Sequence, residues 1–299
     1  MKNSENKVHL HGFINEVKSV ENESGRKTYF IDLATMESYT DKAKNRQRKY
    51  TFHDVQVSTS DKDQIAQLDK IADDCKENIA NKEVEGYKPK SHTGSFDGVL
   101  TTKKRETEDT TYYNTVVIAS AETMRLDTPL QENEVRNRAE LKGNIASIDI
   151  KDNFARISIA THYYVPSETP VEDHTGKQRN YVEKTNFVET QISGNFRKDE
   201  FEAIKNGKIA VGDLVEARGQ IHNNNYTDKD GVNRYKMVVD LNKLTVVAKK
   251  EEKKEKAAET KEAPEAKKET KKAASNKKEQ AKEEKPKKAV SRKKKGMSV

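Results

Sequence analysis

The sequence predicts an all-β protein made of two copies of one unit, each with five strands and a single helix. Segments of the first half recur in the same order in the second half, most of them alternate apolar and polar residues, and one stretch in each half has a helical period instead. The paired segments are "NKVHLHGFINEVKSV" with "NRAELKGNIASIDI", "FIDLAT" with "RISIAT", "TFHDVQVS" with "NFVETQIS", and "FDGVL" with "ARGQI". A repeat of this length indicates tandem domains rather than a short-period solenoid.

In the first unit, the strand-like runs are 8–17, 28–34, 50–57, 95–101 and 111–119. A helical stretch lies between the third and fourth runs, with one apolar stripe made of Ile65, Leu68, Ile71, Cys75 and Ile79. In the second unit, the strand-like runs are 140–148, 154–161, 183–193, 215–221 and 234–246, with a shorter helix near 198–206.

Five strands with a helix between the third and fourth is the layout of the OB-fold barrel. Small β-sandwiches show a similar strand pattern but usually lack that helix. We therefore predict two tandem five-stranded OB-fold barrels, 1–125 and 137–248, joined by a linker over 126–136. Residues 249–299 are predicted to be a disordered tail, because their Lys, Glu and Ala offer no apolar face to bury.

Positive charge is concentrated in that tail. It carries a net charge of +10, whereas the rest of the chain carries −3. The overall basic balance therefore says little about the two predicted barrels. Twenty cations on a flexible tether would nevertheless attract nucleic acid without sequence preference, and salt would weaken that attraction.

Composition also excludes several classes of protein. A single cysteine, Cys75, rules out an intrachain disulfide framework and suits a reducing compartment; its place on the helical stripe indicates packing. The N-terminal residues lack the apolar core of a signal peptide, and no run approaches the roughly 20 apolar residues of a membrane span. We expect a cytoplasmic, nucleoid-associated protein with no membrane partner.

The sequence offers little support for catalysis. "HTGKQ" around Gly176 lacks the upstream Gly and the following Ser or Thr of a phosphate-binding loop, and indicates a hairpin turn. His9 and His11 share a strand face, but no third ligand lies nearby in sequence. We expect no enzyme activity, no metal and no cofactor.

The third strand of each unit places a phenylalanine on a polar face. In the first unit Val55 and Val57 mark the core face, so Phe52 points the other way with Asp54 and Gln56. In the second unit Phe187 shares the outer face with Glu189 and Gln191. Two interpretations remain open: a loop covers each ring, or unpaired bases stack on it. A β-bulge would exchange the two faces.

Several segments resemble bacterial single-stranded DNA-binding proteins. They are "ESYTDKA" and "YTFHDVQV" in the first unit and "GKIAVGDLVEARGQI" and "GQIHNNNYTDKDGVNRY" in the second, and the resemblance covers roughly residues 6–247. That family stacks bases on aromatic residues in the loop after strand two, on strand three and in the loop between strands four and five. The resemblance implies sequence-nonspecific binding and protection of single-stranded DNA in replication, recombination, repair or transfer.

Carried over by position, the resemblance implies stacking at Tyr39 and Phe52, with Tyr50 beside them, in the first unit. In the second unit it implies stacking at Tyr163 or Tyr164, Phe187 and Tyr226. The first unit departs from the family in its late loop, where Lys103, Lys104 and Arg105 stand in place of an aromatic and suggest phosphate contacts.

Three further departures are the absence of Trp, the long insert "NKEVEGYKPKSHTG" before strand four, and the tail. Family members usually end in an acidic tail with a hydrophobic tip, whereas this tail is basic and has no such tip. The partner-docking role of the family tail is therefore not carried over.

Basic residues beside the aromatics are expected to contact phosphate. Five lie between Tyr39 and Tyr50, in the predicted loop, and five in the second unit: Lys42, Lys44, Arg46, Arg48, Lys49, Lys177, Arg179, Lys184, Arg218 and Arg234. For any one of them alone, the alternative is a solvated surface charge. The remaining tyrosines in strands (Tyr29, Tyr112, Tyr113 and Tyr235) are as consistent with core packing.

The resemblance also bears on assembly. Family members work as four OB-folds, so two per chain implies a homodimer, with replication or recombination proteins as possible partners. Two other functions stay open: an adaptor whose barrels bind protein, and an RNA-binding module, because stacking does not distinguish the two sugars.

Overall fold

The computed structural model describes residues 4–22, 25–40, 44–106, 111–131, 134, 136–172, 176–223, 226–227, 233–234 and 237–250. All of them belong to one compact unit, Met1–Ala257. The predicted disorder of the tail therefore concerns residues that lie almost entirely outside the described ranges.

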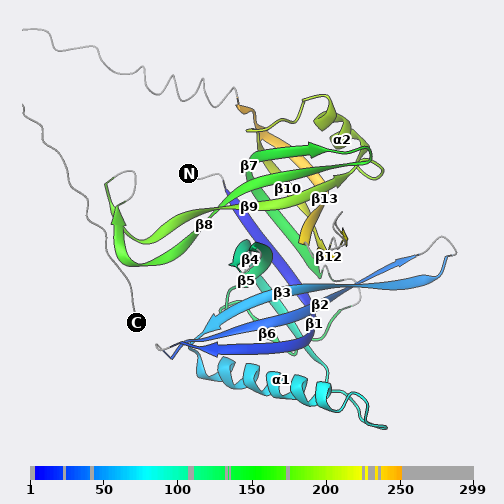
Figure 1. Ribbon diagram of the computed structural model, residues 1–299, viewed down its shortest axis with the longest axis vertical. Coiled ribbons are helices and arrows are strands. Elements are labelled where there is room, and N and C mark those ends of the chain that lie inside the picture. Colours follow the sequence, from blue (N-terminus) through cyan, green and yellow to red (C-terminus); the bar gives the residue numbers. More distant parts are fainter. Residues whose placement is uncertain are drawn as a thin grey trace, which may run out of the picture. The chain divides into compact units, whose positions relative to one another are not determined.

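The first half of the chain forms a closed β-barrel (Figure 1). Its strands are β1 (Glu5–Glu21), β2 (Lys27–Thr40), β3 (Arg46–Thr59), β4 (His92–Glu106) and β5 (Thr111–Ala119). They pair in the order β1-β2-β3-β5-β4, and a β1–β4 pairing closes the barrel. Helix α1 (Lys62–Ala80) lies between β3 and β4, and a short β6 (Arg125–Leu126) pairs with β4.

The second half repeats this arrangement. Its strands are β7 (Asn137–Ile150), β8 (Phe154–Glu172), β9 (Gln178–Ser193), β10 (Leu214–Asn223) and β13 (Met237–Ala248), with α2 (Lys198–Lys205) between β9 and β10. The short strands β11 (Tyr226–Thr227) and β12 (Asn233–Arg234) form a separate two-stranded sheet. Both halves thus have the strand order and helix position of the OB-fold, which confirms the predicted fold class.

Glycines in the first strand of each barrel allow the strand to coil closely over its neighbour. A Cβ atom on Gly12 would lie 2.3 Å from the Ala34 carbonyl oxygen, and one on Gly143 would lie 2.1 Å from the Ala160 carbonyl oxygen. A register shift follows each glycine, in β1 and in β7. Glycines and bulges at matching positions are the features that bend a sheet into a barrel.

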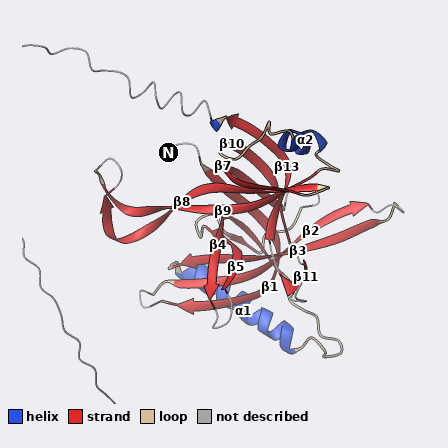
Figure 2. Cartoon of the chain, turned by 45° about the horizontal axis from the view of Figure 1, so that its top comes forward, coloured by secondary structure: helices blue, strands red, loops and turns tan. Residues whose placement is uncertain are grey.

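The two barrels share one continuous sheet because β1 pairs antiparallel with β7 (Figure 2). Val8 faces Ala139 at the middle of this pairing. Asn6 adds a buried side-chain contact across the join: its Nδ2 donates to the Leu100 carbonyl oxygen (2.7 Å) and to Thr161 Oγ1 of the second barrel (3.2 Å). The exact domain and linker boundaries stay a prediction.

Two hairpins extend beyond the barrels, β2–β3 and β8–β9 (Figure 1). Their strands are longer than the sequence pattern predicts. The pattern missed the ends of these strands because the hairpin ends are polar and lack apolar alternation. Gly176 and Lys177 of "HTGKQ" lie between β8 and β9, as the predicted turn requires, with Gly176 at φ 77°.

Other predicted positions can be located in the described part of the chain. Cys75 and Tyr29 are buried, which confirms packing for both. His9 pairs with Asp97 and His11 with Glu134, and no cluster of three or more metal-binding side chains occurs among the described residues. No described helix has the length and apolar character needed to cross a membrane.

Candidate nucleic-acid interface

The predicted faces of β3 and β9 are correct. Val55 and Val57 are buried, whereas Phe52 is 47% exposed; on β9 Val188 is buried and Phe187 is 54% exposed. No register shift interrupts the β2–β3 pairing, so the faces are not exchanged. Because about half of each residue is exposed, no described loop fully covers either ring.

The two phenylalanines occupy equivalent places in their barrels. Phe52 faces Ala34 of β2, and Phe187 faces Ala160 of β8. A small residue opposite leaves one side of each ring open. An exposed ring beside a small neighbour, at the same register in both copies, is a surface on which a flat group can stack.

Charge changes sign along this face of the first barrel. On one side of Phe52 lie Asp32 and Asp54, which face each other across β2 and β3; burial raises the pKa of both carboxyls. On the other side follow Tyr50, which is exposed, and then Arg48, with Arg46 two residues further along the same face. A phosphate backbone is therefore attracted to the hairpin end and repelled from the carboxylate end.

The hairpin changes the predicted position of Tyr39 and of the cations. Tyr39 was expected in a loop, but it lies within β2, opposite Gln47 and five residues from Ala34, so it points to the face away from Phe52. Lys49 points to that other face too. Lys44, exposed and at φ 66°, lies just before β3 begins. Lys42 is outside the described residues. The cations therefore flank both faces of a two-stranded ribbon.

A groove adjoins the aromatic residues of the first barrel. It has a volume of about 440 Å³ and lies among β1, β2, β3 and the segment that follows α1. Its lining residues are Phe13, Ile14, Asn15, Ala34, Tyr50, Phe52, Asn78, Pro89, Lys90 and Ser91. The insert before β4, which is unusual in the sequence, thus lies beside Phe52, where no sequence pattern placed it, and Phe13 was not among the predicted site residues.

In the second barrel, β9 carries a further exposed aromatic on the face of Phe187. Tyr181 lies six residues before Phe187, and the Arg179 guanidinium lies 5.8 Å from its ring centroid. Extending the strand alternation backwards would have identified Tyr181. Lys177 is exposed in the turn, whereas Lys184 and the half-buried Tyr163 face each other and point away from Phe187.

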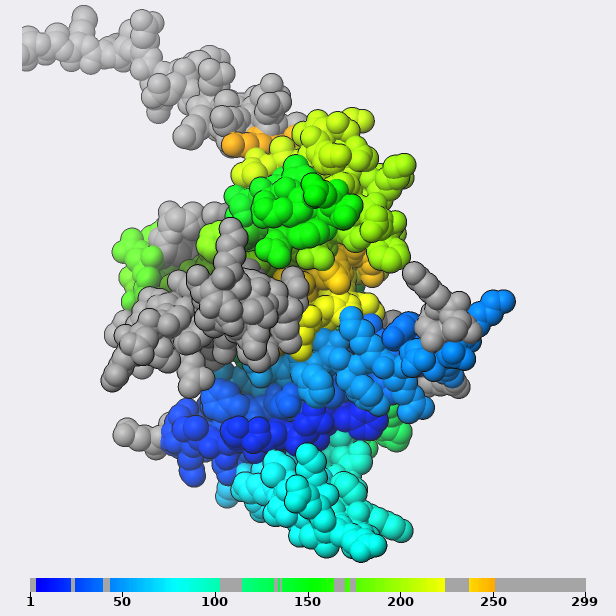
Figure 3. All heavy atoms as spheres, turned by 45° about the vertical axis from the view of Figure 1, so that its right-hand side comes forward, coloured from blue at the N-terminus to red at the C-terminus, as the bar shows by residue number. Residues whose placement is uncertain are grey.

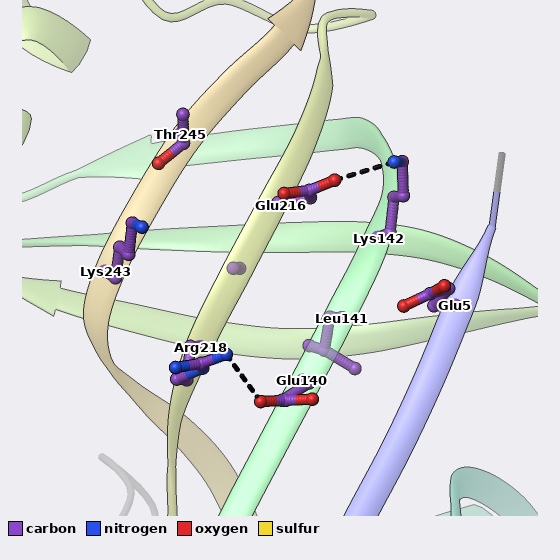
Figure 4. A pocket seen from close by; sticks show the side chains of 9 residues that line it. Glu5, Glu140, Leu141, Lys142, Glu216, Arg218, Lys243 and Thr245 are labelled. Carbon is purple, nitrogen blue, oxygen red and sulfur yellow. Dashed lines mark hydrogen bonds and ion pairs between the residues drawn. The ribbon is translucent and has the colours of Figure 1, made fainter.

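Arg218 is not brought together with Phe187. It lies on β10, which β13 separates from β9, and it pairs with Glu140 (2.8 Å) beside a second pair between Lys142 and Glu216 (2.6 Å; Figure 4). Lys142 holds the pKa of the Glu216 carboxyl below its usual range. This face of the β7–β10 sheet is a ladder of paired charges, so Arg218 is a weaker candidate for phosphate binding than the sequence suggested.

The remaining predicted residues are located by backbone alone. Lys103, Lys104 and Arg105 were expected in a loop but lie within β4, opposite β5. Tyr164 lies in β8, and Tyr226 pairs with Arg234 between β11 and β12. The positions of these six side chains are outside the described part of the structure.

Neither a family model nor a curated protein matches this sequence. Among solved structures, the chain is similar to the wild-type single-stranded DNA-binding protein from Thermus aquaticus, with a TM-score of 0.52 and 16% identity over 82% of this chain and 94% of that one. A deletion mutant of the Thermus protein gives a TM-score of 0.51 and 16% identity over 83% and 97% of the two chains. These similarities establish the fold along most of the chain.

Proposed function

We propose that this protein binds single-stranded DNA without strong sequence preference, as a non-enzymatic protein acting in replication, recombination, repair or transfer. One observation carries the proposal: an exposed phenylalanine stands on the outer face of the third strand in both barrels, Phe52 opposite Ala34 and Phe187 opposite Ala160. Stacking of a base on an aromatic ring contributes about 1–3 kcal/mol and tolerates any base.

The charge pattern supports a strand rather than a duplex as the ligand. Arg46 and Arg48 lie on the same face as Phe52, beyond Tyr50, on a ribbon that leaves the barrel. Stacking on Phe52 requires an unpaired base, and cations one or two residue pairs away are well placed for its phosphates. A duplex would present only its phosphates to this surface.

Binding of the full-length chain to labelled oligo(dT), duplex DNA and RNA of equal length, over a salt series, tests the proposal. We expect oligo(dT) to bind more tightly than duplex. Phe52→Ala and Phe187→Ala are each expected to weaken oligo(dT) binding about 5- to 150-fold without changing the salt dependence, because stacking releases no counterions. Equal affinity for duplex, or unchanged binding by both variants, would refute the proposal. Stronger binding to RNA would make RNA the ligand.

We further propose that two chains assemble into a homodimer with four OB-folds. The resemblance of segments in both barrels to single-stranded DNA-binding proteins, over roughly residues 6–247, supports this. Light scattering after size exclusion, at micromolar concentration, tests it, and a monomer there would contradict it.

A further inference from the structure

We propose that the first barrel holds one unpaired nucleobase in a preformed groove between Phe52 and the segment that follows α1, and that the second barrel has no such site. The inference rests on the proposed binding of single-stranded DNA and assigns a specific subsite to one barrel. It also makes the two barrels unequal in function.

The floor of the groove has a slot-like arrangement. Ala34 is the cross-strand neighbour of Phe13 on β1 and of Phe52 on β3. The two phenylalanines are therefore on the same face of the sheet, two strands apart, which is a separation on the order of 10 Å between their backbones. Tyr50 extends the aromatic surface towards the cations. Two rings on either side of a methyl group suit a flat aromatic ligand better than an extended aliphatic one.

The wall of the groove is fixed before any ligand arrives. Asn78 of α1 donates from Nδ2 to the Lys90 carbonyl oxygen (2.7 Å), and its Oδ1 accepts from the Lys90 backbone N–H (2.9 Å) and from the Tyr87 hydroxyl (2.9 Å). Lys90 Nζ donates to Asp74 (2.6 Å) and Glu77 (2.8 Å), which raises the pKa of this ammonium. A wall that is already ordered lowers the entropic cost of binding.

Among the residues that the structure describes, the second barrel lacks both parts of the groove. The residues equivalent to Phe13 and Tyr50, by their register against Gly143 and Phe187, are Asn144 and Thr185. Helix α2 has 8 residues where α1 has 19, so the described segment between β9 and β10 has no equivalent of the second half of α1. In the space-filling view, α1 and the segment after it (cyan) lie against the strands of the first barrel (blue; Figure 3).

A base is the occupant that the surroundings favour. The volume of about 440 Å³ is within the usual range of roughly 300–1,000 Å³ for small-ligand sites. Arg46 and Arg48 lie beyond Tyr50, where a phosphate joined to the bound base would be attracted, and Asp32 and Asp54 repel phosphate from the opposite end. An apolar protein side chain could pack against the aromatic residues, but it carries no phosphate that the arginines at one end and the aspartates at the other would orient.

A bulky substitution at a residue in the wall of the groove would block it and so tests the inference. Ser91 is exposed and lines the groove, so Ser91→Trp places a large ring there without removing any of the aromatic residues. Ser60→Trp, at an exposed serine at the other end of β3, is the matched control. With the full-length chain and oligo(dT), we expect S91W to weaken binding roughly 5- to 150-fold, the worth of one stacked base, and S60W to change it less than twofold.

A second test removes part of the floor of the groove and makes the matching change in the second barrel. Phe13→Ala is expected to weaken binding by a similar factor, and Asn144→Ala, at the equivalent position, to leave it unchanged; thermal melts verify that both variants fold. If F52A and F187A weaken binding but S91W does not, the groove inference is wrong and the proposed function stands. If F52A and F187A have no effect either, the proposed function fails first.

Discussion

Replacement of His53 by valine, the residue that the second barrel has at the equivalent position (Val188), is expected to make the folded protein more resistant to acid. His53 lies on the core face of β3, 1% exposed. Its Nε2 bonds to Thr35 Oγ1 (2.8 Å), and its Nδ1 has no partner in the described part of the structure. Burial, and to a smaller extent the nearby His222 of the second barrel, together lower the pKa of His53 from 6.5 to about 3.

The sign of the effect follows from where the proton binds. Below pH 6.5 the unfolded chain takes up a proton on this imidazole, whereas the folded chain does not until the pH approaches 3. The contribution of the neutral, buried imidazole to the free energy of unfolding is therefore fully present above pH 6.5 and is lost as the pH falls towards 3. At pH 5 the loss is about 2 kcal/mol, from a difference of about 1.5 pH units at 1.36 kcal/mol each.

Urea unfolding of the full-length chain at pH 7.5 and pH 5.0 measures this. We expect the free energy of unfolding to fall by about 2 kcal/mol less in H53V than in the wild type. Asp240, which is also near His222 and whose pKa burial raises, titrates in both proteins and cancels in the comparison. His222→Thr introduces the residue that the first barrel has at the equivalent position, Thr101. This change removes only the smaller of the two causes that lower the pKa of His53, so it should reduce the loss of stability at pH 5.0 only in part.

An equal loss of stability in H53V and wild type between these pH values would refute the reasoning. It would mean that His53 is already hydrated or charged in the folded state. Because His53 and His222 come from different barrels, the result also reports on whether their shared surface stays dry.

Three other predictions follow from the fold and the charges. Gly12→Ala and Gly143→Ala should each destabilise the fold by roughly 1–3 kcal/mol in thermal melts, because the added Cβ meets a carbonyl oxygen; an unchanged melting temperature would contradict the close strand contact. Asn6→Ala should cost about 1–3 kcal/mol in urea unfolding, since it leaves the Leu100 N–H without its bond, and a neutral result would mean that water replaces the amide. Lys44→Ala with Arg48→Ala should reduce the slope of log K against log salt for oligo(dT) by about 0.7 per lost phosphate contact, and an identical slope would exclude both cations.

Strand faces could be predicted from the sequence because the side-chain period of a strand is fixed. Val55 and Val57 were enough to orient Phe52 correctly, and the same argument oriented Phe187. The ends of the strands were harder to predict from the sequence. None of the described side chains at 36–39 and 44–49 is buried, so no apolar alternation shows that the strands continue, and Tyr39 was placed in a loop.

The groove was beyond the reach of sequence patterns for a different reason. Its lining residues, among them Phe13, Phe52 and Pro89, come from segments that are far apart in the chain. The amide of Asn78 that fixes its wall is one polar residue on a helix and gives no periodic signal. The separation of Arg218 from Phe187 was hidden for a similar reason, since alternation places Arg218 outside the barrel but does not say on which side.

The two barrels show what joining two copies in one chain permits. Positions that build the fold are the same in both: glycines at 12 and 143, and asparagines at 6 and 137 that bond to the fourth strand. The exposed phenylalanine on the third strand is also common to both barrels. Positions around the ligand surface differ, with Phe13 against Asn144 and Tyr50 against Thr185. In an assembly of identical single barrels, a substitution changes every copy at once. Two barrels encoded in tandem escape that constraint, so the first can have a walled groove beside Phe52 while Phe187 of the second stays an exposed ring.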